Sequence, residues 1–254
     1  MKLLNIFCFL ILFQIPNQAN NLEHYIMQGD SAYKKFELES ALTYYKKAFE
    51  INPENYNSLE RMTKICNDLA EFYYELKEED KAEKIVYEGV DHAKEFRKLF
   101  PDSAKVYTYL AWSFGNQALF EGGKEKIKLA HKIRDNATKA IAMDTTDYLP
   151  YIILSIYNRQ IASLSWFERL FANTFFGDVP EGSFEDAEKY MLKALQIQPN
   201  IIIAYFHLSL IYREMDEEEK EVVALKKILD LPVYDFRDEF AKLKAEKRLE
   251  ELLN

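Results

Sequence analysis

The sequence predicts an all-α protein in which helix pairs stack into a superhelix. Apolar and small residues recur at offsets of three, four and seven from a fixed origin, which is the spacing of one helix face. Each helix-ending position lies six residues before the next origin. The 7 glycines and 7 prolines in 254 residues are too few turn residues for an all-β fold. Packed helices are therefore the expected class.

The first helix of each pair carries a small residue at a fixed place. Aromatic residues or Leu mark five origins, and the fourth residue after each origin is always small. A small side chain lets a second helix approach closely, and a strand, with its period of two, cannot give this spacing. The origins are Tyr25, Leu59, Tyr107, Tyr151 and Tyr205, and the small residues are Gly29, Thr63, Ala111, Ser155 and Ser209.

The second helix of each of the first four pairs ends at a proline or at Thr145. Ala41, Tyr45, Ala48 and Pro53 are spaced four, three and five residues apart, and the segment from Ala187 to Pro199 repeats those spacings. Proline ends a helix because it lacks an N–H donor and restricts the residue before it. Weaker copies of the pattern end at Pro101 and Thr145.

The first period, from Tyr25 to Leu59, is 34 residues long, which is the tetratricopeptide value. The phrases ALTYYKKAFEINPENY and AEKYMLKALQIQPN resemble second helices of tetratricopeptide repeats. The later periods are 48, 44 and 54 residues, so the middle repeats hold extra residues. We expect a superhelix of about five helix pairs with an inserted short helix and a C-terminal capping helix. The expected repeats are 22–55, 56–103, 104–147, 148–201 and 202–234, and the capping helix is 235–254.

The N-terminus predicts a secretory signal peptide over residues 1–19. Lys2 precedes an apolar segment from Leu3 to Phe13, Pro16 breaks it, and Ala19 is a small residue before a cleavage point. The apolar segment is shorter than the roughly 20 residues that span a bilayer. We expect a secreted or periplasmic protein, and the alternative is a protein anchored to the membrane by an uncleaved N-terminal segment.

Charge and cysteine content narrow the function. The net charge of −9 argues against a nucleic-acid partner, which needs a concentrated basic face. Without the leader and its Cys8, Cys66 stands alone on an apolar helix position, so we expect a small buried thiol. The four histidines are scattered, and His207 is expected at the surface or lining the groove. We predict no catalytic residues, no metal site, no cofactor and no enzymatic activity.

Residues 164–183 form an insertion with its own helix signal. Ser165 and Glu168 have capping-box spacing, and an apolar stripe runs from Trp166 through Phe171 to Phe175. The stripe predicts either core packing or a lid over an apolar ligand or a partner helix. Arg134, Asp135, Glu168 and Arg169 predict ion pairs that hold the inserted helix to its neighbour, with contact to a ligand as the alternative. Asn158 and Arg159, on the preceding helix, are candidate groove residues, and Asn158 breaks the apolar phase.

The stretch from about Phe120 to Leu231 resembles the regulator of microtubule dynamics family. The similar segments are 123–147 and 164–194, and Trp166, Glu168, Arg169, Phe176, Gly177 and Pro180 stand at positions of that family's motif. The resemblance implies an adaptor or tether built on a repeat domain.

We therefore predict a scaffold that binds a protein or peptide segment in its concave groove. Two alternatives stay open, a binder or carrier of an apolar ligand such as a lipid, and a membrane-anchored tether. The candidate groove or ligand-binding residues are Asn158, Arg159, Trp166, Arg169, Phe171 and Phe175.

Overall fold

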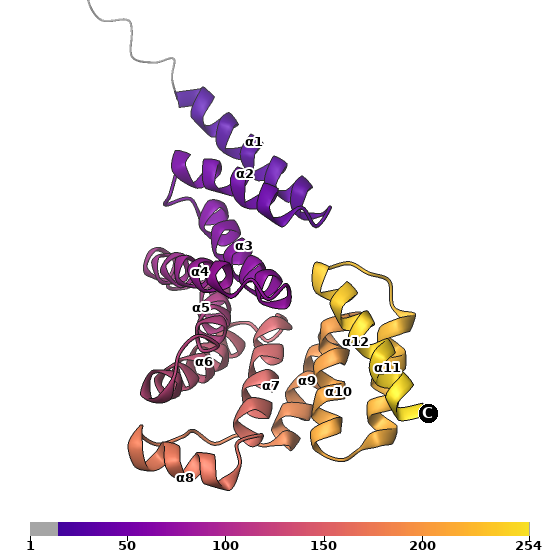
Figure 1. Ribbon diagram of the computed structural model, residues 1–254. Helices are drawn as coiled ribbons and strands as arrows, with labels where there is room; N and C mark the ends of the chain where they lie inside the picture. The colour runs from indigo at the N-terminus through magenta and orange to yellow at the C-terminus, as the bar shows by residue number, and fades with distance from the viewer. Residues whose placement is uncertain (1–14, 254) are drawn as a thin grey trace, which may run out of the picture.

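The structure, a computed structural model, describes residues 15–253. Every regular element in this part of the chain is an α-helix (Figure 1). Five pairs pack in order, α8 is inserted within the fourth pair, and α12 follows the fifth, which confirms the predicted architecture. The helices are α1 (Ile15–Tyr33), α2 (Leu38–Ile51), α3 (Tyr56–Glu75), α4 (Glu79–Leu99), α5 (Ala104–Gln117), α6 (Gly123–Met143), α7 (Leu149–Ala162), α8 (Trp166–Phe175), α9 (Phe184–Ile197), α10 (Ile202–Glu214), α11 (Glu218–Asp230) and α12 (Phe236–Leu253).

The small residue of each first helix marks the close approach of its partner. A Cβ added to Gly29 would lie 2.3 Å from the Tyr45 ring of α2, so only glycine fits there without a shift. Thr63, Ala111 and Ser155 are fully buried at the same repeat position. The hydroxyl of Ser155 donates to the carbonyl oxygen of Ala187 on the paired helix α9 at 2.6 Å. The recurrent small residue thus sets the spacing within each pair.

A recurring hydrogen bond accounts for the constant six-residue spacing between the end of one helix pair and the origin of the next helix. The Tyr107 hydroxyl donates to the carbonyl oxygen of Pro101 at 2.9 Å. Tyr205 bonds in the same way to Pro199 at 3.2 Å, and Tyr151 reaches Thr145 at 3.4 Å. Each tyrosine therefore satisfies a carbonyl in the turn that leads into its own helix, and this contact fixes the turn relative to the next pair.

Three of the turns within pairs use a non-glycine residue in the left-handed region. Phe36, Lys77 and Asp216 have φ angles of 61°, 63° and 57°. In each turn the next amide donates to a carbonyl five residues before it, which satisfies a free carbonyl at the helix end. Because glycine is absent from these positions, no strong turn signal marks them in the sequence. These amide bonds are Glu37 to Ala32, Glu78 to Tyr73 and Glu217 to Tyr212.

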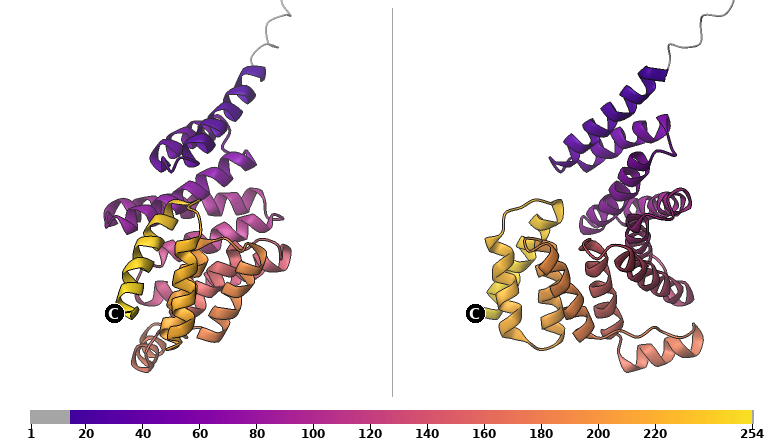
Figure 2. Two further views of the ribbon diagram at one scale, coloured as in Figure 1. Left: turned by 90° about the vertical axis from the view of Figure 1, so that its right-hand side faces the viewer. Right: turned by 180° about the vertical axis from the view of Figure 1, so that it is seen from behind.

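The C-terminal helix does more than cover the last pair. α12 packs on α10 and α11, and its beginning also reaches α3, so the superhelix curls back on itself (Figures 1 and 2). Phe236 of α12 is buried against the apolar cluster of α3 that includes Leu69 and Phe72. The predicted cap is thus also a contact between the last repeat and the second.

Most of the predicted leader lies outside the described residues, because the structure describes the chain from Ile15 onward. α1 begins at Ile15 and runs through Ala19, the predicted cleavage point. Between residues 15 and 253, no helix has the length and apolar content needed to cross a bilayer. Secretion and membrane anchoring stay predictions.

Candidate functional site

We use the term inner face for the side on which α3, α5, α7 and α10 turn toward α12 (Figure 1). One end of it is acidic and aromatic. Asp68 and Glu71 of α3 both bind the guanidinium of Arg237, which also lies over the ring of Trp112 on α5 at 5.3 Å. Trp112 in turn donates its indole N–H to Glu71. The beginning of α12 therefore occupies this end of the inner face.

Asp68 is fully buried and remains ionised. Burial alone would raise its pKa, but the charges of Lys64 and Arg237 outweigh burial and hold the pKa below its usual value. Lys64 lies 2.7 Å from one carboxylate oxygen, and Arg237 binds the other. The carboxylate thus depends on a partner from α12, more than 160 residues away in sequence.

A second part of the inner face lies around Arg159 and His207. Arg159 of α7 forms one ion pair, with Glu214 of α10 at 3.5 Å, and its Nε is buried without a hydrogen-bond partner. The Nδ1 of His207 on α10 is likewise buried and unpartnered. Burial, followed by the charges of Arg159, Lys244 and Arg237, lowers the pKa of His207 to about 3. This part therefore combines the charge of Arg159 with two polar atoms that lack partners.

Asn158 and Arg169 line an open pocket of about 420 Å³ beside the inserted loop. The Asn158 amide donates to the Leu154 carbonyl at 2.7 Å, so its side chain satisfies the backbone of its own helix. A Cβ on Gly182 would lie 2.9 Å from Cβ of Ile161 and 3.1 Å from the Asn158 carbonyl, which shows how closely the loop approaches α7. Glu181, Ser183 and Asp186 complete a polar lining.

The inserted helix α8 begins with the predicted capping box. Ser165 accepts from the Glu168 amide at 3.3 Å, and the Glu168 carboxylate accepts from the Ser165 amide at 2.9 Å. The apolar stripe is not part of the core, because Trp166, Phe171 and Phe175 are exposed. They line neither this pocket nor the one between α3 and α4.

The six candidate residues fall into three separate places. Arg159 lies on the inner face, Asn158 and Arg169 line the polar pocket, and the three aromatic residues project from α8. The expected ion pairs between α8 and its neighbour are wrong for the described residues. Arg134 instead pairs with Asp135 on its own helix. Arg169 fixes α8 by donating to backbone carbonyls, those of Ile161 at 2.9 Å and Pro180 at 3.3 Å.

Three possible metal-ligand atoms lie within 4.8 Å of one another, one each from Cys66, Glu88 and His92. The sequence pattern does not indicate this arrangement. Lys46 already pairs with the Glu88 carboxylate at 3.0 Å. Burial raises the pKa of the fully buried Cys66 thiol, which opposes the thiolate form that a metal ligand needs. The geometry fits a neutral buried thiol beside an ion pair better than a metal site.

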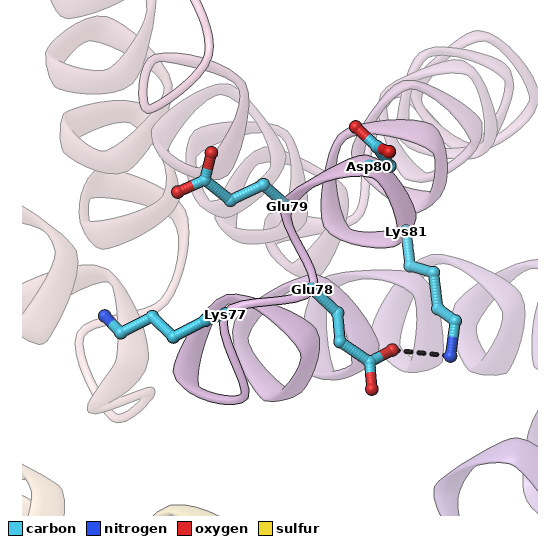
Figure 3. Close-up of a pocket in the computed structure, with 5 residues that line it drawn as sticks. All are labelled: Lys77, Glu78, Glu79, Asp80 and Lys81. Atoms are coloured by element: carbon cyan, nitrogen blue, oxygen red, sulfur yellow. Dashed lines mark ion pairs between the residues drawn. The ribbon is translucent and has the colours of Figure 1, made fainter.

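A second open pocket, of about 500 Å³, lies at the turn between α3 and α4. Five consecutive residues, 77–81, line it, and Figure 3 shows that Lys77 and Glu79 point away from the pair formed by Glu78 and Lys81. Glu78 and Lys81 pair with each other. Glu79 and Asp80 lie in the first turn of α4, where negative charge complements the helix dipole. These charges therefore stabilise a helix end.

The sequence reading missed most of the inner face. Asp68, Glu71, Trp112 and Arg237 meet only because α12 returns to α3, and no local pattern encodes a contact across the superhelix. His207, which is expected at the surface or lining the groove, lies on α10 with its Nδ1 buried. Its position one residue before the phase residue Leu208 is the signal that the sequence offers.

Comparison with known proteins identifies the family. The family model for regulator of microtubule dynamics protein 1-3 matches residues 25–253. The regulator of microtubule dynamics protein 1 of Bos taurus is 26% identical over 239 residues, covering 92% of this chain and 73% of that protein. The Mus musculus protein of the same name is 27% identical over 197 residues, covering 74% of this chain and 62% of that protein.

Among solved structures, a thermophilic TPR protein of Thermus thermophilus has the same fold, with a TM-score of 0.64 at 14% identity. The match covers 90% of this chain and 98% of that one. This likeness confirms the tetratricopeptide-type architecture that the 34-residue period predicted. The chain belongs to the regulator of microtubule dynamics protein 1-3 family.

Proposed function

We propose that this protein is a non-enzymatic scaffold that binds an acidic protein segment on its inner face, between Arg159 and His207. Stacked helix pairs expose an extended inner surface of this kind because each pair contacts mainly its neighbours. The observation that supports the proposal is the pair of unpartnered buried atoms, Nε of Arg159 and Nδ1 of His207. A buried polar atom without a partner costs about 1–3 kcal/mol, and a ligand with matching acceptors removes that cost.

Charge indicates the chemistry of the partner. Arg159 places positive charge near His207, and so do Lys244 and Arg237, although these two are already paired with carboxylates of α3. Burial is the largest cause that lowers the pKa of Arg159, and Glu214 only partly offsets it. A carboxylate from an Asp, a Glu or a chain terminus accepts from Arg159 Nε and, in the Nδ1–H tautomer, from His207. Such charge-assisted hydrogen bonds are about twice as strong as neutral ones.

Peptide display followed by binding measurements tests the proposal. Random peptides are selected on the full chain, and the enriched peptides are measured by fluorescence anisotropy. We expect an acidic consensus and a loss of affinity of about tenfold or more for Arg159→Ala and His207→Ala, since a hydrogen bond to a charged group is worth about 1.5–3 kcal/mol. Arg159→Lys keeps the charge without Nε and should bind weakly too.

Arg134→Ala is the matched control, because Arg134 lies on α6 and pairs with its neighbour Asp135. It should bind like the unchanged protein. Enriched peptides without acidic residues, or equal binding by both inner-face variants and the control, would contradict the proposed site. Thermal unfolding of each variant shows whether the fold is retained.

A further inference from the structure

The helix α8 presents its apolar side to the outside of the molecule. Among the described helices its backbone approaches only that of α6, and none of its residues is buried. Figure 1 shows it at the edge of the superhelix, and Figure 2 shows the same from behind. Its five large apolar side chains are between 46% and 76% exposed. They are Trp166, Phe167, Leu170, Phe171 and Phe175.

The polar side of α8 faces the protein, which reverses the usual amphipathic arrangement. Arg169 and Asn173, four residues apart and thus on one side, hold the backbone of the neighbouring segments. Arg169 donates to two carbonyl oxygens, and Asn173 accepts from the amide of Val179 at 2.7 Å. At 100° per residue, the five apolar residues span about half of the helix circumference, and Arg169 and Asn173 lie outside this span. A surface helix normally buries its apolar stripe in its own core.

This apolar side is held in place. The Phe171 ring lies 4.7 Å from Phe175 and 5.6 Å from Phe176, centroid to centroid. Phe176 packs against the beginning of α6, where a Cβ on Gly123 would lie 3.1 Å from the ring. His131 of α6 also contacts the Asp178 carbonyl at 3.3 Å. Phe171, Phe175 and Phe176 thus form an aromatic cluster beside α6.

The helix α6, beside this aromatic cluster, is basic, whereas the chain as a whole is acidic. α6 carries six basic and two acidic residues, a balance of 6 − 2 = +4, whereas the whole chain is −9. Lys124, Lys126, Lys128 and Lys132 are exposed on it. Exposed aromatic residues next to lysines match the interface of an anionic bilayer, where rings insert among the headgroups and cations stay at the charged surface.

We propose that α8 inserts its aromatic side into the surface of an anionic membrane while α6 contacts the lipid headgroups. A second copy of this chain fits less well, because two α8 helices face to face would bring the two basic α6 helices together. The protein would then lie on the membrane through α8 and leave the inner face for a protein partner. This inference is independent of the peptide site, and Arg159→Ala should bind vesicles normally.

Vesicle flotation with the full chain tests the proposal. Vesicles of phosphatidylcholine are compared with vesicles that also contain phosphatidylserine. We expect binding to the anionic vesicles, reduced at least about tenfold by Trp166→Ser/Phe167→Ser, since each buried aromatic residue contributes strongly to partition. Lys124→Glu/Lys128→Glu should weaken binding to anionic vesicles only. The matched control is Val223→Ser/Leu243→Ser, two comparably exposed apolar residues on α11 and α12, which should bind normally.

Three results would overturn the proposal. The first is no binding of the unchanged protein to either vesicle, and the second is equal binding by the α8 double variant, which would assign the binding to another part of the chain. The third is a dimer in sedimentation equilibrium that Trp166→Ser/Phe167→Ser converts to monomers without any vesicle binding. That result would assign α8 to contact between copies. The double variants change exposed side chains only, so retained helical circular dichroism confirms folding in each case.

Discussion

His207 ties the stability of the protein to pH. Its pKa in the folded protein is about 3, against an ordinary value of 6.5. Burial is the largest cause of this decrease, and the positive charges of Arg159, Lys244 and Arg237 lower the pKa further. Below pH 6.5, His207 binds a proton in the unfolded chain but stays neutral in the folded protein. The contribution of His207 to the free energy of unfolding is therefore fully present above pH 6.5. It falls as the pH drops toward 3, by at most about 1.4 kcal/mol per pH unit.

Urea unfolding at neutral and acidic pH measures this effect. Carboxylates also titrate in the acidic range, so the comparison is between the unchanged protein and His207→Gln, which cannot bind the proton. We expect the variant to lose less stability than the unchanged protein when the pH is lowered. Equal losses in both proteins would show that His207 is protonated in the folded state near its ordinary pKa.

The helix α8 is an element whose stability should be separate from that of the repeats. Ser165→Ala removes a capping box worth about 1 kcal/mol, but α8 buries no residue. We expect faster amide hydrogen exchange within 166–175 and an unchanged melting temperature. Ser183→Ala is the matched comparison, because Ser183 caps α9, which buries Ala187, Met191 and Ala194. Ser183→Ala should lower the melting temperature. An equal decrease for Ser165→Ala and Ser183→Ala would show that the stability of α8 is not separate from that of the repeats.

At the same scale, the helices of the repeats were predictable because each has a local cause. Tyr107 bonds to Pro101 within its own turn, and Gly29 touches Tyr45 of its paired helix, so both causes recur with the repeat. The direction of α8 was not predictable. Its apolar stripe and capping box specify a helix, but Arg169 and Asn173 decide which side faces the protein by binding backbone atoms of the adjoining segments. Such contacts leave no periodic signal.

On the scale of the whole molecule, the contact between α12 and α3 sets how far the superhelix curls. Arg237 joins Asp68 and Glu71 to α12, while the rest of α12 packs on α10 and α11. The ends of this contact are more than 160 residues apart in sequence. Each pair otherwise packs mainly on its neighbours, so a small change in angle between pairs accumulates along the stack. The shape of the inner face therefore depends on this distant contact, in which the ion pairs of Arg237 lie beside the buried ring of Phe236.

Removing Arg237 should open the superhelix. Arg237→Ala leaves the fully buried Asp68 with Lys64 as its remaining ion partner, and breaking a buried ion pair costs about 3–5 kcal/mol. We expect lower stability in urea and a larger radius of gyration in small-angle X-ray scattering. Lys244→Ala removes the more exposed pair with Glu75 and should cost less than about 1 kcal/mol with no change in size.

A second substitution separates the charge from the contact. Asp68→Asn/Arg237→Ala removes the buried carboxylate together with its partner, so it should recover part of the stability that Arg237→Ala loses, because no unpaired charge remains. Its radius of gyration should stay large, since the ion pairs of Arg237 between α12 and α3 are still missing. If Arg237→Ala matches the unchanged protein in both stability and size, the packing of Phe236 and of α12 on α10 and α11 alone holds the curl.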